Sequence, residues 1–262
     1  DDNTASGYYA LYSNTTGEKN IAIGSGALDA PDTENDNLAI GYDALGGAID
    51  GGEFNVAIGN YSLDANTTGD NNTAIGYNSL SANTTGGNNT ASGSWALYSN
   101  TTGANNTALG YGALAANTEG AYNVASGLSA LAANTTGEFN VAIGQYSLDA
   151  NTEGDHNTAL GYDAGDVITT GSQNVIIGSV SDPSANSATN QIVIGYGVTG
   201  TGNNEIALGN TSISAIKAQV TSITGYSDSR IKRDIRDTDL GLAFINLLRP
   251  VKYRLKNPAD YP

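Results

Sequence analysis

The chain has 262 residues, a formal net charge of -16 at pH 7, 34 glycines, and neither cysteine nor methionine. Only 39% of its residues are hydrophobic, which disfavours a conventional globular core. The acidic charge makes nucleic acid a poor partner, no apolar run is long enough to insert into a membrane, and the lack of cysteine excludes disulfides.

A 17-residue repeat fills most of the chain. One copy is NTAIGYNSLSANTTGGN, residues 72–88, and its first asparagine recurs at steps of 17, with one step of 18 across the loop-like GGAIDGGEF. These asparagines are Asn3, Asn20, Asn37, Asn55, Asn72, Asn89, Asn106, Asn123, Asn140, Asn157 and Asn174. Repeats of this length predict a solenoid in which each copy forms one rung.

The repeat boundaries divide the chain into four parts. Regular rungs occupy residues 1–178, and irregular last rungs, QIVIGYG and EIALGN, follow within 179–209 at a step of 14. Residues 210–226 form a neck. Residues 227–262 carry eight basic and five acidic residues, whereas residues 1–226 carry two basic and 21 acidic ones.

Each rung opens with a short strand pattern, because medium apolar residues alternate with small ones in NTAIG. A leucine follows at the ninth place, and then NTTG or NTEG forms a turn in which we expect the glycine to take a positive φ. Two short strands and two turns per rung predict an all-β fold, a parallel β-roll or β-solenoid. Its eleven regular rungs, about 4.8 Å apart, would span roughly 50 Å.

A narrow roll buries little apolar surface, so we expect the alanine and glycine face of NTAIG to pack against another copy. Three copies around an axis are favoured. In the neck, Ile213, Ile216, Val220 and Ile223 are spaced three, four and three residues apart, and β-branched residues at both core positions of a heptad favour trimers. The same residues would also suit intertwined strands.

The rungs NTAIG…SLSANTTGGNN resemble the YadA-type head repeats of trimeric autotransporter adhesins, which are left-handed parallel β-rolls assembled as trimers. Similar repeats occur in phage tail fibres. The resemblance covers residues 3–209, although the 17-residue step here is longer than the usual one. It implies a homotrimeric fibre or adhesin head.

The segment SDSRIKRDI and the following LAFINLLRPVKYRLK resemble the start of the C-terminal intramolecular chaperone of phage tail fibres, of the peptidase S74 type. The family motif Ser-Asp-x-Arg-x-Lys is matched by Ser227, Asp228, Arg230 and Lys232. The resemblance implies one self-cleavage between Tyr226 and Ser227, with Ser227 as nucleophile and Lys232 as general base. Without the resemblance, Ser227 or Asp228 is an N-cap of a helix through Ile235. Only 36 residues follow Tyr226, fewer than a complete chaperone domain of this family has.

Several side chains in the rungs are candidate binding groups. Five aromatic residues form a candidate receptor-binding stripe that would stack on sugars, or alternatively pack between chains: Tyr61, Tyr77, Trp95, Tyr111 and Tyr146. His156, the single histidine, is interpreted as a surface residue. Acidic loop residues would bind calcium or, as we favour, carry solvated charge: Asp64, Asp70, Asp149, Glu153 and Asp155.

These observations together predict a structural and receptor-binding fibre of a phage tail. It would be a part of the virion that binds other tail or baseplate proteins and attaches to a host surface glycan or protein. We expect no cofactor, no metal and no turnover beyond the single self-cleavage. The alternative is a bacterial trimeric adhesin head on the cell surface. A glycan depolymerase, which needs a close pair of carboxylates, and an ice-binding protein, suggested by the threonines of NTTG, are less favoured.

Overall fold

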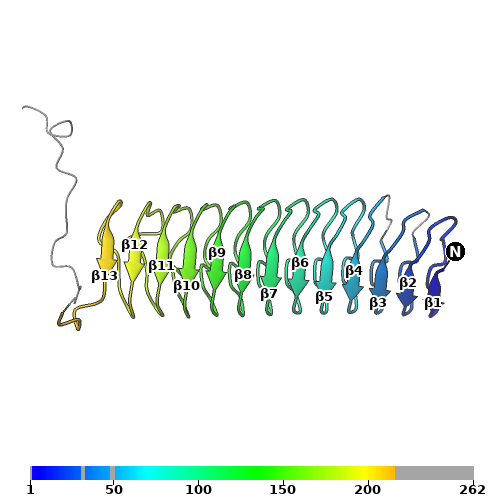
Figure 1. Ribbon diagram of the computed structural model, residues 1–262, viewed down its shortest axis with the longest axis horizontal. Helices are drawn as coiled ribbons and strands as arrows, with labels where there is room; N and C mark the ends of the chain where they lie inside the picture. The colour runs from blue at the N-terminus through cyan, green and yellow to red at the C-terminus, as the bar shows by residue number, and fades with distance from the viewer. Residues whose placement is uncertain (1, 31–32, 48–50, 216–262) are drawn as a thin grey trace, which may run out of the picture. The chain divides into compact units, whose positions relative to one another are not determined.

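The computed structural model describes residues 2–30, 33–47 and 51–215, and within them the chain is a parallel β-solenoid without helices (Figure 1). The thirteen strands are β1 (Thr4–Ser6), β2 (Ile21–Ile23), β3 (Leu38–Ile40), β4 (Val56–Ile58), β5 (Thr73–Ile75), β6 (Thr90–Ser92), β7 (Thr107–Leu109), β8 (Val124–Ser126), β9 (Val141–Ile143), β10 (Thr158–Leu160), β11 (Val175–Ile177), β12 (Ile192–Ile194) and β13 (Ile206–Leu208). The predicted all-β repeat fold is confirmed. The predicted C-terminal helical segment, 227–262, and most of the neck lie outside the described residues.

All strands pair in parallel, in chain order, in a single sheet. The repeat fixes the register, so that Ala57 lies opposite Ala74 and Ala74 opposite Ala91. The 18-residue step keeps this register, because Leu38 of β3 pairs with Val56 of β4. The 14-residue step does the same, since Ile192 of β12 pairs with Ile206 of β13. Insertions and deletions are therefore absorbed outside the strands.

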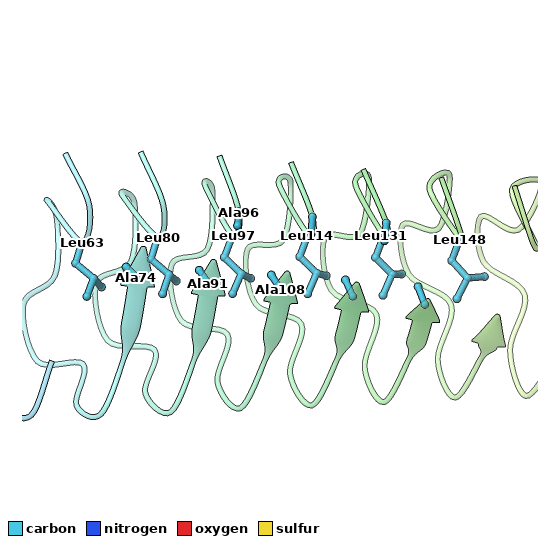
Figure 2. Close-up of a cluster of buried hydrophobic side chains, with 14 of the residues drawn as sticks. Leu63, Ala74, Leu80, Ala91, Ala96, Leu97, Ala108, Leu114, Leu131 and Leu148 are labelled. Atoms are coloured by element: carbon cyan, nitrogen blue, oxygen red, sulfur yellow. The ribbon is translucent and has the colours of Figure 1, made fainter. Parts of the chain in front are cut away.

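The core consists of alanines and leucines in register. We count each repeating asparagine as place 1 of its rung. The alanines at place 3 from Ala22 to Ala159 and the leucines at place 9 from Leu28 to Leu148 are fully buried. Figure 2 shows the leucines of successive rungs lying side by side, with the strand alanines close to them. The expectation that the alanine face packs against another copy is therefore wrong. Beside each leucine, the narrow interior has room for a side chain as small as the methyl group of alanine.

One rung shows how closely the interior is filled. Place 9 is occupied by Gly165 instead of leucine, and a Cβ built there would lie 3.0 Å from the Leu148 side chain and 3.5 Å from that of Ile168. Ile168 and Ile176 are both fully buried and fill the volume that the missing leucine leaves. The two isoleucines therefore compensate for the leucine that this rung lacks.

The second half of each rung is not a strand, contrary to the prediction of two strands per rung. The place 9 leucines have left-handed backbones, with φ between 47° and 54° from Leu11 to Leu148. An extended strand cannot contain such residues. The backbone still bonds from rung to rung, because Leu80 N–H donates to Ala96 O at 3.0 Å and Ala82 N–H to Tyr98 O at 3.2 Å.

The glycines have different roles from the predicted one. Positive φ belongs to the glycine directly after each strand, with values of 133° to 147° from Gly7 to Gly195. The glycine of NTTG does not have a positive φ but lacks room for a side chain. A Cβ at Gly86 would lie 2.3 Å from Gly103 O and 2.6 Å from Asn83 Oδ1. Space, rather than backbone conformation, selects glycine in this turn.

Two columns of buried asparagines connect the rungs. At place 1, Asn72 N–H donates to Asn55 Oδ1 at 2.9 Å, and Asn72 Nδ2 donates to Gly86 O at 2.9 Å. At place 12, Asn83 Nδ2 donates to Asn66 Oδ1 at 2.8 Å and also to Gly86 O at 2.9 Å. The Gly86 carbonyl thus accepts from both columns, which holds the two ends of the rung together. The turn asparagine thus bonds to its own turn as well as to the preceding rung.

The place 12 column predicts that replacing asparagine by aspartate destabilises the fold far more inside the column than at the surface. Asn100 donates to Asn83 Oδ1 and Gly103 O and accepts from Asn117 Nδ2, all within the buried interior. Asn100→Asp removes both donations and places a buried carboxylate against two oxygens. We expect the free energy of unfolding to fall by about 3–5 kcal/mol, measured by chemical denaturation.

The control is Asn105→Asp, at an exposed residue with φ of 59°, which aspartate tolerates. This variant should unfold within about 0.5 kcal/mol of the wild type. Equal losses in the two variants would show that added charge, and not the asparagine column, is responsible.

Candidate functional site

The outer face of the sheet is an apolar surface. Places 2 and 4 of each rung flank the buried alanine and point away from the core, and many are isoleucine, leucine or valine. We call these residues of β1–β13 the sheet face. Its exposed apolar members are Ile21, Ile23, Ile75, Leu109, Val124, Ile143, Leu160, Ile194, Ile206 and Leu208.

The extent of the sheet face is unusual for a free surface. Thirteen strands at about 4.8 Å give a length of about 60 Å, and three residues per strand give a width of about 10 Å. Isoleucine, leucine or valine fills 18 of the 26 outward places on the thirteen strands, and threonine or serine fills the other eight. The face of about 600 Å² is therefore mostly apolar and comparable with the largest apolar patch of a monomer. Lys19 is the one lysine or arginine in the described part of the chain, so acidic and polar surface surrounds this patch.

A run of five contacting aromatic rings lies just beyond the ends of four strands, β3 to β6. Ring centroids are 5.4 Å apart for Tyr42 and Tyr61, 6.1 Å for Tyr61 and Tyr77, 5.8 Å for Tyr77 and Trp95, and 4.6 Å for Trp95 and Tyr98. We call these five residues the first aromatic cluster. The contacts are edge-on or tilted, as aromatic pairs prefer.

The repeat explains this run. Tyr42 and Tyr77 occupy place 6 of their rungs, whereas Tyr61 and Trp95 occupy place 7, so the rings alternate between two neighbouring columns. Place 7 has a left-handed backbone, with φ of 58° at Tyr61 and 65° at Trp95. Tyr42 and Tyr77 are 46% and 45% exposed, which leaves a large part of each ring open to solvent.

Three carboxylates lie at the N-terminal end of this cluster. Burial raises the pKa of Asp64, and the nearby Asp43 and Asp29 carboxylates raise it further. Burial and Asp43 likewise raise the pKa of Asp29. The Asp43 carboxylate also raises the pKa of the neighbouring Tyr42 hydroxyl. The acidic residues are therefore closer together than their dispersion along the sequence suggested.

A smaller group of tyrosines and aspartates lies further along the solenoid. Tyr146 and Tyr162 have ring centroids 6.3 Å apart, and a hydrogen bond to Asp163 raises the pKa of the Tyr162 hydroxyl. Burial raises the pKa of Asp149, with further contributions from Asp166 and Asp163. We call Tyr146, Tyr162 and these three aspartates the second aromatic cluster. Both clusters combine a YSLDAN rung with a GYDA rung.

The structure separates the five predicted stripe residues. Tyr61, Tyr77 and Trp95 lie together in the first cluster, and Tyr146 belongs to the second. Tyr111 is 59% exposed and makes no ring contact within the described part of the chain. Tyr42, Tyr98 and Tyr162 were missed. For Tyr42 and Tyr162 the alternation of aromatics between places 6 and 7 was the available signal, and contact across the rungs was not inferred from it. Tyr98 stands at place 10 and joins the cluster through Trp95 of its own rung.

His156 is exposed, as predicted, and it also ends a stack of three rings. Tyr122 and Phe139 lie 4.9 Å apart with an interplanar angle of 1°, and Phe139 and His156 lie 5.0 Å apart at 4°. All three occupy place 17, so their spacing follows the rungs. This stack and the two clusters are made by different columns.

The loop acids that were weighed as calcium ligands bind the backbone instead in two cases. Asp70 Oδ1 accepts from Glu53 N–H at 2.8 Å, and Asp155 Oδ1 accepts from Glu138 N–H at 2.7 Å. Among the described residues, no group of three acidic or histidine side chains is arranged to hold a metal ion.

Ser227, Asp228, Arg230 and Lys232 lie outside the described residues, so the proposed cleavage site has no described geometry. No family model matches the chain, and no curated protein sequence matches it. In the described ranges there is no helix with the length and apolar character of a membrane span.

One carboxylate predicts a pH dependence of stability. Asp182 stands at place 9, and its Oδ1 is buried without a hydrogen-bond partner. Burial, a hydrogen bond to Asp166 and the Asp166 charge raise the pKa of Asp182 from 3.8 to about 7. Between these values the folded chain retains a proton that the unfolded chain has released, so stability falls as pH rises through this window.

Asp182→Asn should remove this dependence. We expect thermal melting between pH 4.5 and 7.5 to show a smaller decline in the variant than in the wild type, with the variant more stable at pH 7.5. Asp70→Asn is the control, since it alters an exposed carboxylate. A wild-type melting temperature that rises across this range would contradict the assignment.

Proposed function

We propose that this chain is a structural and receptor-binding fibre of a phage tail. It assembles as a homotrimer through the sheet face and attaches the virion to the host surface. The sheet face carries the proposal, because a mostly aliphatic face of about 600 Å² on an otherwise polar, acidic solenoid has the size of surfaces through which chains associate. A stiff rod with one apolar side suits a fibre whose chains pack along their length.

The number of chains and the phage origin have separate support. The isoleucine and valine spacing of the neck favours three chains, and the rung sequence resembles trimeric adhesin heads and tail fibres. The SDSRIK segment resembles the chaperone of phage fibres, which favours this origin over the bacterial adhesin head. Partners at the other end of the fibre would be tail or baseplate proteins.

Trimerisation through the sheet face predicts that charge placed there gives monomers. Native mass spectrometry should show a trimer for the wild type and a monomer for the double variant Leu109→Glu, Ile143→Glu, whose residues are 42% and 43% exposed. The substitutions leave the core intact because both side chains point outward. Thr102→Glu is the control, since glutamate occurs naturally at the same place in Glu119 and Glu153.

Attachment is measured with the same proteins, fluorescently labelled, on a panel of bacterial strains. The wild type should bind some strains, and the monomeric variant should bind them more than about ten-fold more weakly because three linked sites become one. A monomeric wild type would contradict the assembly. A trimer that binds no strain would contradict attachment and leave the fibre architecture.

The C-terminal motif predicts one covalent change. In the full-length gene product, denaturing mass spectrometry should find wild-type chains that end at Tyr226 and intact Lys232→Ala chains. The physical reason is that Ser227 needs a neutral amine to accept its proton. Lys256→Ala, which removes a lysine outside the motif, should be cleaved like the wild type. An intact wild type would reduce the motif to a helix cap.

A further inference from the structure

We infer that each aromatic cluster is a binding site for an uncharged polysaccharide, so that one chain carries two such sites along one edge of the solenoid. This inference rests on the proposed function and names the receptor chemistry. The exposed rings carry it. The carboxylates beside them define no ligand by themselves.

The first aromatic cluster combines exposed aromatic faces with neighbouring carboxylates. Aromatic faces pack on the C–H faces of sugar rings, and the half-exposed rings of Tyr42 and Tyr77 offer such faces. The carboxylates of Asp43 and Asp64 beside them accept hydrogen bonds from sugar hydroxyl groups. An aromatic platform bordered by acceptors is complementary to a polyhydroxylated ring.

The aromatic platform of the first cluster is elongated. Its rings follow the rungs, so the surface extends along the solenoid axis over four rungs, from Tyr42 to Tyr98. A long open platform suits a chain of several sugar units better than a single small molecule, which needs a concave site. Each unit then contributes a weak contact.

The negative charge of the surface around the clusters restricts the kind of ligand. Within the described residues no lysine or arginine other than Lys19 exists to pair with sulfate, phosphate or carboxylate groups. An anionic polysaccharide would face Asp43, Asp64 and Asp163 without compensation. The ligand is therefore an uncharged polysaccharide.

Part of this arrangement, a pair of tyrosines with neighbouring aspartates, occurs twice. Tyr61 and Tyr146 occupy the same place in rungs five repeats apart, which corresponds to about 24 Å along the solenoid. Each has a tyrosine followed by an aspartate in a neighbouring rung, Tyr42–Asp43 or Tyr162–Asp163. Two weak sites on one rigid rod bind a long polysaccharide more tightly than either alone.

The single tryptophan gives a direct test, because Trp95 belongs to the first cluster. Its fluorescence is titrated in the full chain with a soluble glucan, a mannan, a galactan and, as an anionic comparison, heparin. We expect a saturable change with at least one of the three neutral polymers and none with heparin. Tyr77→Ala should weaken the response about ten-fold, since it removes a stacking ring.

Tyr122→Ala is the matched control, at 52% exposure against 45% for Tyr77, and it should respond like the wild type. No response to any neutral polymer, a response to heparin alone, or equal affinity in Tyr77→Ala would overturn the inference. Native mass spectrometry of the same samples separates the two proposals. A trimer without a fluorescence response removes the sugar sites and leaves the fibre, whereas a monomer that responds does the reverse.

Discussion

The structure depends on buried asparagine side chains whose hydrogen bonds need both their own rung and a neighbouring rung. A buried amide without partners costs about 1–3 kcal/mol, so two such columns strongly penalise any rung that leaves the register. The place 12 column ends where Ile168 replaces asparagine, and Asn151 Oδ1 is left there as a buried acceptor without a partner. Each interior asparagine of the column avoids such a buried acceptor without a partner. A period of 17 residues is the usual result, and the 18-residue step keeps the column as well, because Asn55 N–H donates to Asn37 Oδ1 at 2.9 Å.

That period orders the rest of the molecule into columns. Leucines pack on leucines and alanines on alanines, which is why a narrow interior of small side chains can still be closely filled (Figure 2). The same rule acts on the outside, where residues at one place of the rung become neighbours in space. Ring stacks such as Tyr122, Phe139 and His156 arise in this way without any long-range folding event. Surface chemistry is therefore determined one column at a time.

Much of the fold could be predicted from the sequence, because the period, the strand position and the parallel register are all expressed in the spacing of Asn3 to Asn174. The direction in which side chains point could not. The alternation in NTAIG is compatible with either the alanines or the isoleucines facing the core. The space that Leu80 leaves in the interior selects the alanines. The left-handed leucines were equally hidden, since leucine has no preference for positive φ. For the candidate site, residue types were evident, but contacts such as Tyr42 with Tyr61 require knowing that places 6 and 7 are adjacent columns.

The left-handed residues also explain where function can vary. A non-glycine residue at positive φ costs on the order of 1–3 kcal/mol unless its surroundings enforce it. At place 7 the neighbouring rung does so, as when Trp95 N–H donates to Tyr77 O at 3.0 Å and Tyr146 N–H to Leu128 O at 3.0 Å. The backbone bonds hold the conformation whatever the side chain is, so this column accepts Tyr, Trp, Asp, Asn and Ser. The core has no such freedom, because the narrow interior restricts the volume of its side chains. The residue type can therefore change at place 7 without disturbing the rod, and Tyr61, Trp95 and Tyr146 of the two aromatic clusters stand at this place.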